Sequence, residues 1–447
     1  MTSISAPGKV LLAGGYLVVD RAYQGIVLGL SARIHAIVQK SNDRGKVIVR
    51  SPQFQDATWC YECHYQSTKV VEVVQEERPG QTPQSRNKFV EIALAYALSY
   101  VAQHEVQGSP SFAITILADS DYYSHESTSK LCSRNPQSRF RDFGVSLQEA
   151  HKTGLGSSAA LVTSLVSAIV LHSMNLEQSN ISDDLKRKLH NLAQIAHCVA
   201  QGKIGSGFDV AAAVYGTCIY RRFSPTILDS LGTLESADFG KQLARTVDDT
   251  DRQIWDTQID ESSIGLPKGL RLVMCDVDCG SETPSMVKKV MGWRTAYPKE
   301  SLSLWEALSK ANMELAAVLQ SSSSGTNTDR ATLKQNILAI RSLIREMSAK
   351  AGVPIEPPVQ THLLDSCSAI QGVVGGVVPG AGGYDALVII LEDQEEVLHQ
   401  LQEFLKSYQS PPDLIHDTQI GQVRLLNVKQ ETEGIKIESS HQYAGWI

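Results

Sequence analysis

The stretch from Lys152 to Leu171, KTGLGSSAALVTSLVSAIVL, constrains the fold of this chain more than any other. Gly154 and Gly156 flank a leucine, and glycine lets the backbone take positive φ values and lie close to a ligand. Ser157 and Ser158 stand where a helix takes its cap, and an apolar run typical of a buried helix follows. A glycine loop that leads into a helix directs unpaired N–H groups and the positive end of the helix dipole toward one point. The sequence therefore predicts an anion site here, most often a phosphate site.

Other interpretations of this stretch are a capped core helix after a flexible loop, a dinucleotide fingerprint and a Walker A loop. The fingerprint G-x-G-x-x-A is matched by Gly154, Gly156 and Ala159, but the preceding FGVSLQEAHK is too polar for the buried strand that this motif requires. A Walker A loop is excluded because no G-K-[ST] follows the glycines. Two interpretations remain: a triphosphate-binding loop of another kind, with a serine hydroxyl placed for Mg²⁺, and a simple capped core helix.

The composition describes a chain that is large enough for two cores. With 447 residues and 42% hydrophobic residues, two domains are expected. The net charge of −7 argues against nucleic acid or an anionic membrane as the main partner, and no obligate protein partner is evident. The start, MTSISAPGKV, lacks the basic and apolar regions of a signal peptide, and polar residues interrupt the most apolar segment. We expect a soluble, cytoplasmic protein.

The eight cysteines are scattered, which is typical of free thiols in a reducing compartment. Cys60 and Cys63 form one C-x-x-C motif, without a second pair at a zinc-ribbon spacing. The surrounding TWCYECHY resembles a strand, which would direct the two thiols to opposite faces. A zinc site is therefore not expected.

The chain begins with strands up to Tyr65, followed by a helix from about Asn87 to Gln103 and a strand that ends at Asp119. The polar segment 120–148 is interpreted either as a surface excursion or as a lid that faces the substrate. Weak periodicity in the segment 225–265 indicates an inter-domain region, which divides the chain into domains 1–225 and 226–447. The second domain alternates strands and helices in the α+β pattern of a split βαβ unit.

A second stretch with candidate functional residues reads GKIGSGFDVAAAVYG. Three glycines surround Lys203 and Ser206, and Asp209 begins a short alanine-rich helix. The carboxylate is interpreted either as a partner of the helix dipole or, given the glycines and the lysine, as a positioned functional group.

Three stretches, APGKVLLAGGY, KTGLGSSAAL and VPGAGGYDAL, resemble in order the three motifs of the GHMP kinases, a family named for galactokinase, homoserine kinase, mevalonate kinase and phosphomevalonate kinase. The details are most similar to the fungal type of the phosphomevalonate kinase branch, because AGGYLVVD stands where galactokinases and mevalonate kinases carry a Glu-His pair. The resemblance implies an α+β fold with an N-terminal domain like domain 2 of ribosomal protein S5, a ferredoxin-like C-terminal domain, and an active site between them.

The resemblance also implies a reaction, the transfer of the γ-phosphoryl group of ATP to the phosphate of 5-phosphomevalonate with Mg²⁺ as cofactor. Alternatives are another GHMP kinase, such as a mevalonate kinase, or a ligand sensor without catalysis on the same fold. Catalytic roles are implied for Lys9, Asp209 and Ser158, with Ser158 also touching Mg²⁺. Nucleotide binding is implied for Asn87, Lys88, Ser120, Asp121, Gly154, Leu155, Gly156, Ser157, Ser158 and Ala159. Acceptor binding is implied for Lys9, Tyr16, Arg139, Lys152, Lys203, Ser206, Gly207, Asp209, Ser281, Ala381 and Gly382.

The charge of this implied acceptor bears on the relative importance of Lys9 and Asp209 for catalysis. A phosphate monoester has a second pKa near 6, so most of it is ionised at neutral pH without a base. The main barrier is then to bring two anions together, and phosphoryl transfer is catalysed mostly by positioning and charge stabilisation. We therefore rank Lys9 above Asp209 in energetic importance. The simpler interpretation of Lys9 is a solvated lysine at a strand end.

Overall fold

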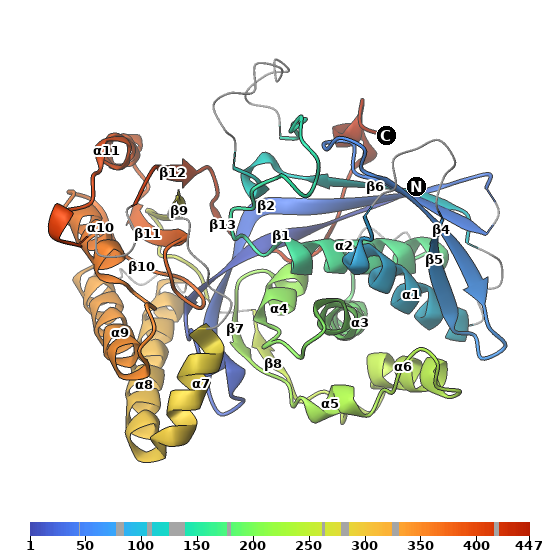
Figure 1. Cartoon of the computed structure of the whole chain (residues 1–447), viewed down its shortest axis with the longest axis horizontal. Coiled ribbons are helices and arrows are strands. Elements are labelled where there is room, and N and C mark those ends of the chain that lie inside the picture. The colour runs from blue at the N-terminus through green and yellow to red at the C-terminus, as the bar shows by residue number, and fades with distance from the viewer. Residues whose placement is uncertain are drawn as a thin grey trace.

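A large, mostly antiparallel sheet forms the body of the N-terminal half (Figure 1). The computed structural model describes residues 1–43, 45–76, 85–104, 110–124, 139–176, 180–261, 264–278, 286–323, 330–414 and 420–447. Within them the sheet has ten strands, in the order β14-β1-β2-β6-β3-β4-β5, with β7 and β13 on β2 and β8 on β7. They are β1 (Thr2–Ala13), β2 (Gly25–Lys40), β3 (Lys46–Arg50), β4 (Thr58–Tyr65), β5 (Val71–Glu76), β6 (Phe112–Ala118), β7 (Cys218–Arg221), β8 (Gln258–Asp260), β13 (Gln430–Glu431) and β14 (Lys436–Ile437).

Helices cover one face of this sheet (Figure 1). They are α1 (Lys88–Gln103), α2 (Ser157–Ser173), α3 (Asp183–Gln201), α4 (Phe208–Tyr215), α5 (Thr226–Asp229) and α6 (Phe239–Asp248), and two 3₁₀ turns, η1 (Leu17–Val19) and η2 (Ser120–Tyr122), follow strand ends. Helix α2 packs between the strands β1 and β2 and the helices α1, α3 and α4. Its residues 162–172 are all buried, as expected of a helix that is apolar all round. The head of α2 is therefore held in a fixed place.

The second sheet has four antiparallel strands in the order β10-β11-β9-β12. They are β9 (Leu270–Val277), β10 (Val373–Val377), β11 (Ala386–Glu392) and β12 (Val423–Leu426). The helices of this half are α7 (Met286–Ala296), α8 (Pro298–Ser323), α9 (Arg330–Ala351), α10 (Pro358–Ser368) and α11 (Glu395–Ser407), with the 3₁₀ turns η3 (Pro412–Leu414) and η4 (Ser440–Tyr443). The strand order is that of a split βαβ unit, so the predicted α+β architecture is confirmed.

The predicted boundary at residue 225 does not separate the two sheets. Strands β8, β13 and β14 follow residue 225 and yet lie in the ten-stranded sheet. Helix α6, in the segment interpreted as an inter-domain region, packs against α1 and α3 through buried Phe239, Leu243 and Val247. These apolar residues stand four apart, a helical signal that the surrounding Asp, Ser and Gly residues obscured. Strands of two or three residues carry too little pattern to be found in a sequence.

The two cysteines of the C-x-x-C motif lie in β4, and both are buried. Among the residues that the structure describes, no group of three or more His, Cys, Asp or Glu side chains could hold a metal ion. A separate search of the same residues found no helix with the length and apolar character needed to cross a membrane.

Candidate functional site

The head of α2 carries the predicted anion site. Gly154 and Gly156 have φ values of 73° and 82°, the left-handed region that favours glycine. Gly156 is the N-cap of α2, so the prediction that the serines take the cap position was wrong: Ser157 is already the first helical residue. Within the described chain no side chain caps this helix, and its first turn holds no acidic residue. The N–H groups of that turn are thus available to an anion.

Strand β1 brings Lys9 to this helix head. The register of β1 against β2 shifts between Pro7 and Gly8, and a Cβ on Gly8 would lie only 3.0 Å from Leu155 O, so the strand passes directly beside the glycine loop. The backbone N–H of Lys9 donates to Leu155 O at 2.9 Å, and its Nζ donates to Gly154 O at 3.4 Å. The Lys9 side chain packs on Gly156, where a Cβ would lie 2.8 Å from Lys9 Cε.

The ammonium of Lys9 is held in a partly desolvated place. It lies 5.7 Å from the centre of the Phe208 ring. Burial lowers the pKa of Lys9, and the negative charge of Asp209 opposes that shift. A cation with so little water around it interacts strongly with a bound phosphate.

Asp209 sits in the first turn of α4, where its Oδ1 accepts a hydrogen bond from the Val210 N–H at 3.0 Å. Its Oδ2 lies 3.8 Å from Nδ1 of His197, a residue of α3 that is 2% exposed. Nε2 of His197 lies 3.1 Å from Ser158 Oγ and 3.2 Å from Nε2 of Gln201. The structure thus joins two predicted catalytic residues through a histidine that the sequence analysis missed.

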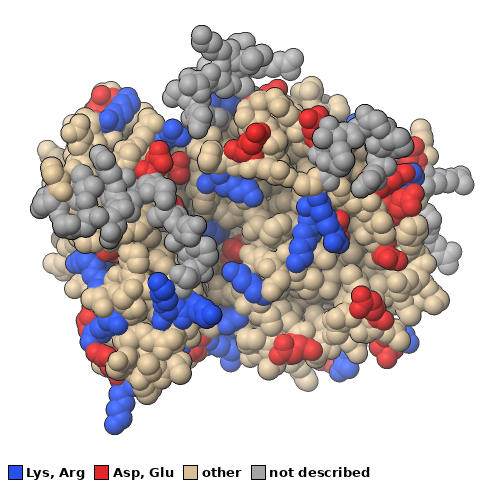
Figure 2. All heavy atoms as spheres, in the orientation of Figure 1, with Lys and Arg blue, Asp and Glu red and all other residues tan. Residues whose placement is uncertain are grey.

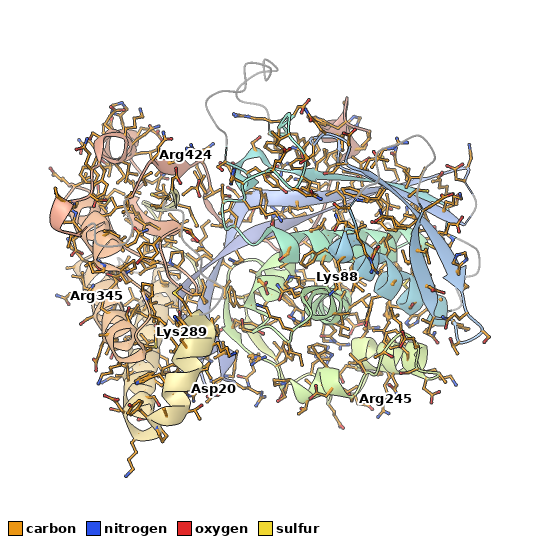
Figure 3. All side chains as sticks on the ribbon, in the orientation of Figure 1. Asp20, Lys88, Arg245, Lys289, Arg345 and Arg424 are labelled. Atoms are coloured by element: carbon orange, nitrogen blue, oxygen red, sulfur yellow. The ribbon has the colours of Figure 1, made fainter. Side chains whose placement is uncertain are left out.

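A loop from the second sheet closes the site on another side. Tyr16, with a φ of 65°, donates from its hydroxyl to Ala381 O at 2.5 Å. A Cβ on Gly15 would lie 2.5 Å from Gly380 O, so the two backbones touch. Tyr16 therefore contacts the loop that carries Ala381 and Gly382, and a role of these residues in acceptor binding stays a prediction. A second contact between the halves is the ion pair of Asp20 with Arg294 of α7 at 2.5 Å, and Figure 3 shows Asp20 beside α7.

The loop before α4 is held by an arginine that the sequence analysis did not single out. Arg222 donates to Val19 O at 2.6 Å and to Gly205 O at 3.0 Å, which fixes the loop that carries Lys203, Ser206 and Gly207. It lies in none of the motifs that the sequence analysis considered. Lys203 is exposed, Ser206 is half-buried, and Gly207 is the N-cap of α4.

An apolar cavity of about 100 Å³ adjoins the head of α2. Trp59, Phe89 and Leu161 line it together with four of the predicted residues, Asn87, Lys152, Ser157 and Ser158. The Asn87 side chain also caps α1 by accepting from the Val90 N–H at 3.3 Å. Lys88 is exposed at the first residue of α1, and Figure 3 shows it among the helices of the N-terminal half. An apolar cavity beside a phosphate site suits a nucleotide base.

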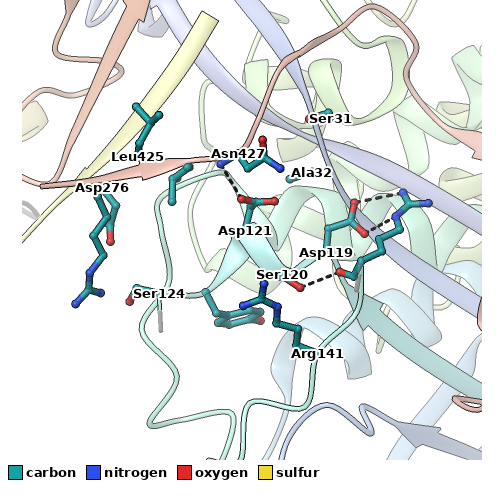
Figure 4. Close-up of a pocket in the computed structure, with 14 residues that line it drawn as sticks. Ser31, Ala32, Asp119, Ser120, Asp121, Ser124, Arg141, Asp276, Leu425 and Asn427 are labelled. Carbon is teal, nitrogen blue, oxygen red and sulfur yellow. Dashed lines mark hydrogen bonds and ion pairs between the residues drawn. The ribbon is translucent and has the colours of Figure 1, made fainter. Parts of the chain in front are cut away.

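A polar cavity of about 440 Å³ lies where the two sheets approach each other (Figure 4). It is lined by Ser31, Ala32, Asp119, Ser120, Asp121, Tyr123, Ser124, Arg139, Arg141, Asp276, Arg424, Leu425, Leu426 and Asn427. Figure 2 shows basic side chains along the hollow that crosses this face. Asp121 accepts from the Asn427 N–H at 3.0 Å, and the Ser120 hydroxyl donates to Arg139 O at 2.9 Å.

Arg139 lies on the wall of this cavity, but its guanidinium is bound to protein groups. Its Nε and Nη2 donate to the two carboxylate oxygens of Asp119 at 2.7 and 3.2 Å, and its Nη1 donates to Gln442 at 2.8 Å. Its predicted role toward the acceptor is therefore less direct than the sequence suggested. Ser281 lies outside the described residues, as do residues 125–138 of the predicted lid.

Comparison with known proteins gives concordant matches. Residues 141–217 match the model of the GHMP kinases N terminal domain. The chain is 47% identical to the phosphomevalonate kinase of Aspergillus fumigatus, over 100% of this chain and 99% of that protein. It is 45% identical to the phosphomevalonate kinase of Gibberella zeae, over 100% of this chain and 98% of that protein. A solved structure, Streptococcus pneumoniae phosphomevalonate kinase in complex with phosphomevalonate and AMPPNP, has a TM-score of 0.62 at 15% identity, over 96% of this chain and 100% of that chain.

Proposed function

Because this chain belongs to the phosphomevalonate kinases of the GHMP kinase family, we propose that it transfers the γ-phosphoryl group of ATP to 5-phosphomevalonate, giving 5-diphosphomevalonate on the mevalonate route to isoprenoids and sterols. The observation that carries this proposal is the meeting of the uncapped head of α2, the Lys9 ammonium and the Asp209 carboxylate at one place.

ATP would lie across the head of α2. The residues from Gly154 to Ala159 offer backbone N–H groups and the positive end of the helix dipole to the triphosphate. The apolar cavity lined by Trp59 and Phe89 begins at the same helix head and would take the adenine. The nucleotide is thereby oriented with its terminal phosphate toward Lys9.

The donor set at the helix head fits Mg²⁺. This ion binds through one or two protein oxygens and completes its shell with phosphate oxygens and water. Ser158 offers a half-buried hydroxyl, and the Asp209 carboxylate lies on the far side of the same histidine. When bound, Mg²⁺ would neutralise charge on the β- and γ-phosphates.

Lys9 and Asp209 have different roles toward the acceptor. The acceptor phosphate is already ionised at neutral pH, so its attack on the γ-phosphorus needs little help from a base. Lys9 lies where the two anions would meet and lowers their mutual repulsion. Asp209 stabilises the charge of Lys9 and orients the acceptor, and acts as a base only secondarily.

A coupled ADP-release assay tests this function. Mevalonate, 5-phosphomevalonate and 5-diphosphomevalonate are offered in parallel, with and without Mg²⁺. We expect Mg²⁺-dependent turnover with 5-phosphomevalonate alone. Turnover with mevalonate alone would identify a mevalonate kinase, and nucleotide binding without turnover of any of the three would identify a sensor.

We also propose that the enzyme works in the cytoplasm and without an obligate protein partner. Cell fractionation with a specific antibody tests the location. Activity of the purified chain in the same assay tests independence from a partner.

A further inference from the structure

The side chain of His197 contacts both Ser158 and Asp209. It projects from α3, whereas Ser158 and Asp209 are the second residues of α2 and α4, so three helices converge on one imidazole. The ring is 2% exposed and lies 6.1 Å, centre to centre, from the ring of Phe89, which lines the apolar cavity.

The neighbours of His197 select its tautomer. A carboxylate only accepts hydrogen bonds, so Asp209 near Nδ1 favours a proton on that nitrogen. Nε2 then carries a lone pair and accepts, which agrees with the Gln201 amide nitrogen pointing at it from 3.2 Å. The Ser158 hydroxyl, at 3.1 Å, must donate its proton to the same Nε2.

A hydroxyl whose proton is turned toward a buried histidine presents its lone pairs to the opposite side. For Ser158 that side is the head of α2, where the triphosphate and its cation would lie. We propose that His197 is a positioning residue that turns the Ser158 hydroxyl into an oxygen ligand for the Mg²⁺ of the nucleotide, an inference that rests on the proposed function. Without His197 the hydroxyl is free to rotate and to point its proton at the cation.

The same helix provides a matched control. His190 lies two turns earlier in α3 and is also 2% exposed. It contacts Asn191 and the rings of Tyr215 and Trp255, and burial lowers its pKa to about 4. Loss of His190 removes a buried imidazole from α3 without touching the helix head.

The experiment compares His197→Asn, His197→Gln and His190→Gln. The probe is an ATP analogue with a fluorescent methylanthraniloyl group on the ribose, titrated with and without Mg²⁺, and the Mg²⁺ dependence of turnover is measured in parallel. The His197→Asn amide stops short of Ser158, so we expect its half-saturating Mg²⁺ concentration to rise about tenfold, while Mg²⁺-free nucleotide binding is unchanged. His197→Gln extends to the place of Nε2 and should restore most of the loss. His190→Gln should leave both readouts as in the wild type.

A double-mutant cycle separates this role from a purely structural one. If His197 acts through Ser158, then His197→Asn in a Ser158→Ala background should cost nothing further in Mg²⁺ dependence. Additive losses, or equal weakening of binding with and without Mg²⁺, would overturn the proposal. Because the binding titration needs no acceptor, it also stands if 5-phosphomevalonate proves not to be the substrate.

The tautomer of His197 can be measured in the wild-type enzyme. This measurement tests the proposal even if the His197 variants do not fold. Nitrogen-15 NMR of histidine-labelled protein should show His197 protonated at Nδ1, with its signal assigned by the shift that Ser158→Ala causes. A ring protonated at Nε2 instead would contradict the proposal.

Discussion

Two glycine-rich loops of similar composition serve different purposes in this molecule. The loop at Gly154 and Gly156 leads into a long buried helix, whose first N–H groups have no capping side chain among the described residues. The loop at residues 379–385 joins β10 to β11, and no helix follows it. A Cβ on Gly382 would collide with Ile355 O, which also accepts the Gly383 N–H at 2.9 Å. Glycine exposes backbone to a ligand in the first loop and lets backbones touch in the second.

Because the two loops differ in this way, we expect substitutions near them to have different effects. Around the first loop we propose that Lys9, Ser158 and Asp209 act on the bound phosphates and that His197 positions Ser158. Around the second loop the structure offers mainly carbonyl groups, including those of Gly380 and Ala381. Changes near the first loop should therefore alter rate, whereas changes near the second should alter stability and acceptor binding.

The largest effect is expected for Lys9→Met. Removal of a cation that offsets charge in phosphoryl transfer costs about 10³-fold in kcat. Asp209→Asn should cost less, about 10-fold to 10²-fold, because the acceptor needs little general-base help. Steady-state kinetics measure both variants, with circular dichroism as the control for folding. A greater loss of kcat in the Asp209 variant would reverse the ranking.

The next effect concerns the ion pair beneath the second loop. Glu356, next to the Ile355 that supports the loop, pairs with Arg341 at 2.8 Å, and both side chains are 1% exposed. Arg345, labelled in Figure 3, adds a contact to Glu356 at 2.9 Å. Glu356→Gln removes the buried countercharge of Arg341, leaves it only the exposed carboxylate of Asp365, and should cost about 3 kcal/mol of stability, with kcat little changed.

Differential scanning calorimetry shows the Glu356 effect as a lowered Tm. The matched control is Asp365→Asn, which removes the other partner of Arg341 at 2.7 Å from a side chain that is 58% exposed. Partners in solvent contribute less than about 1 kcal/mol. A fall in kcat as large as that of Lys9→Met would show that the second loop takes part in the chemistry.

The sequence revealed the parts of this site that depend on local pattern. The glycine loop, the buried helix after it and the Asp209 turn all lie within short stretches with characteristic residues. His197 could not be found in this way, since AQIAHCVAQ is an ordinary apolar helix and only tertiary packing brings its imidazole to Ser158. The pairing of Arg139 with Asp119 is likewise a product of the fold. Strands β13 and β14 pair with residues 400 or more positions away, which no local signal records.

Two glycine substitutions in the first loop separate the effect of backbone strain from the effect of contact with Lys9. Gly156→Ala forces an alanine to a φ of 82° and puts its Cβ 2.8 Å from Lys9 Cε, so we expect the lysine to be displaced and kcat/KM to fall between 10-fold and 10²-fold, or about 2 kcal/mol. Gly154→Ala has a similar φ of 73°, but its Cβ meets no atom of the described residues within 4 Å, so only the backbone cost of about 1 kcal/mol remains. Equal losses in the two variants would show that strain, and not contact with Lys9, governs this loop.

The smallest effect is expected at the joint between the two loops. Tyr16→Phe removes the hydroxyl that donates to Ala381 O, a neutral hydrogen bond that contributes about 1 kcal/mol. Because this bond holds the second loop beside the site and touches no reacting atom, the KM for 5-phosphomevalonate should rise three- to tenfold with kcat nearly unchanged. Tyr100→Phe, which loses a bond to Asp248 between α1 and α6, is the control and should alter neither constant. If Tyr16→Phe lowered kcat and left KM unchanged, the second loop would have to act on the transition state, and the division of labour between the loops would fail.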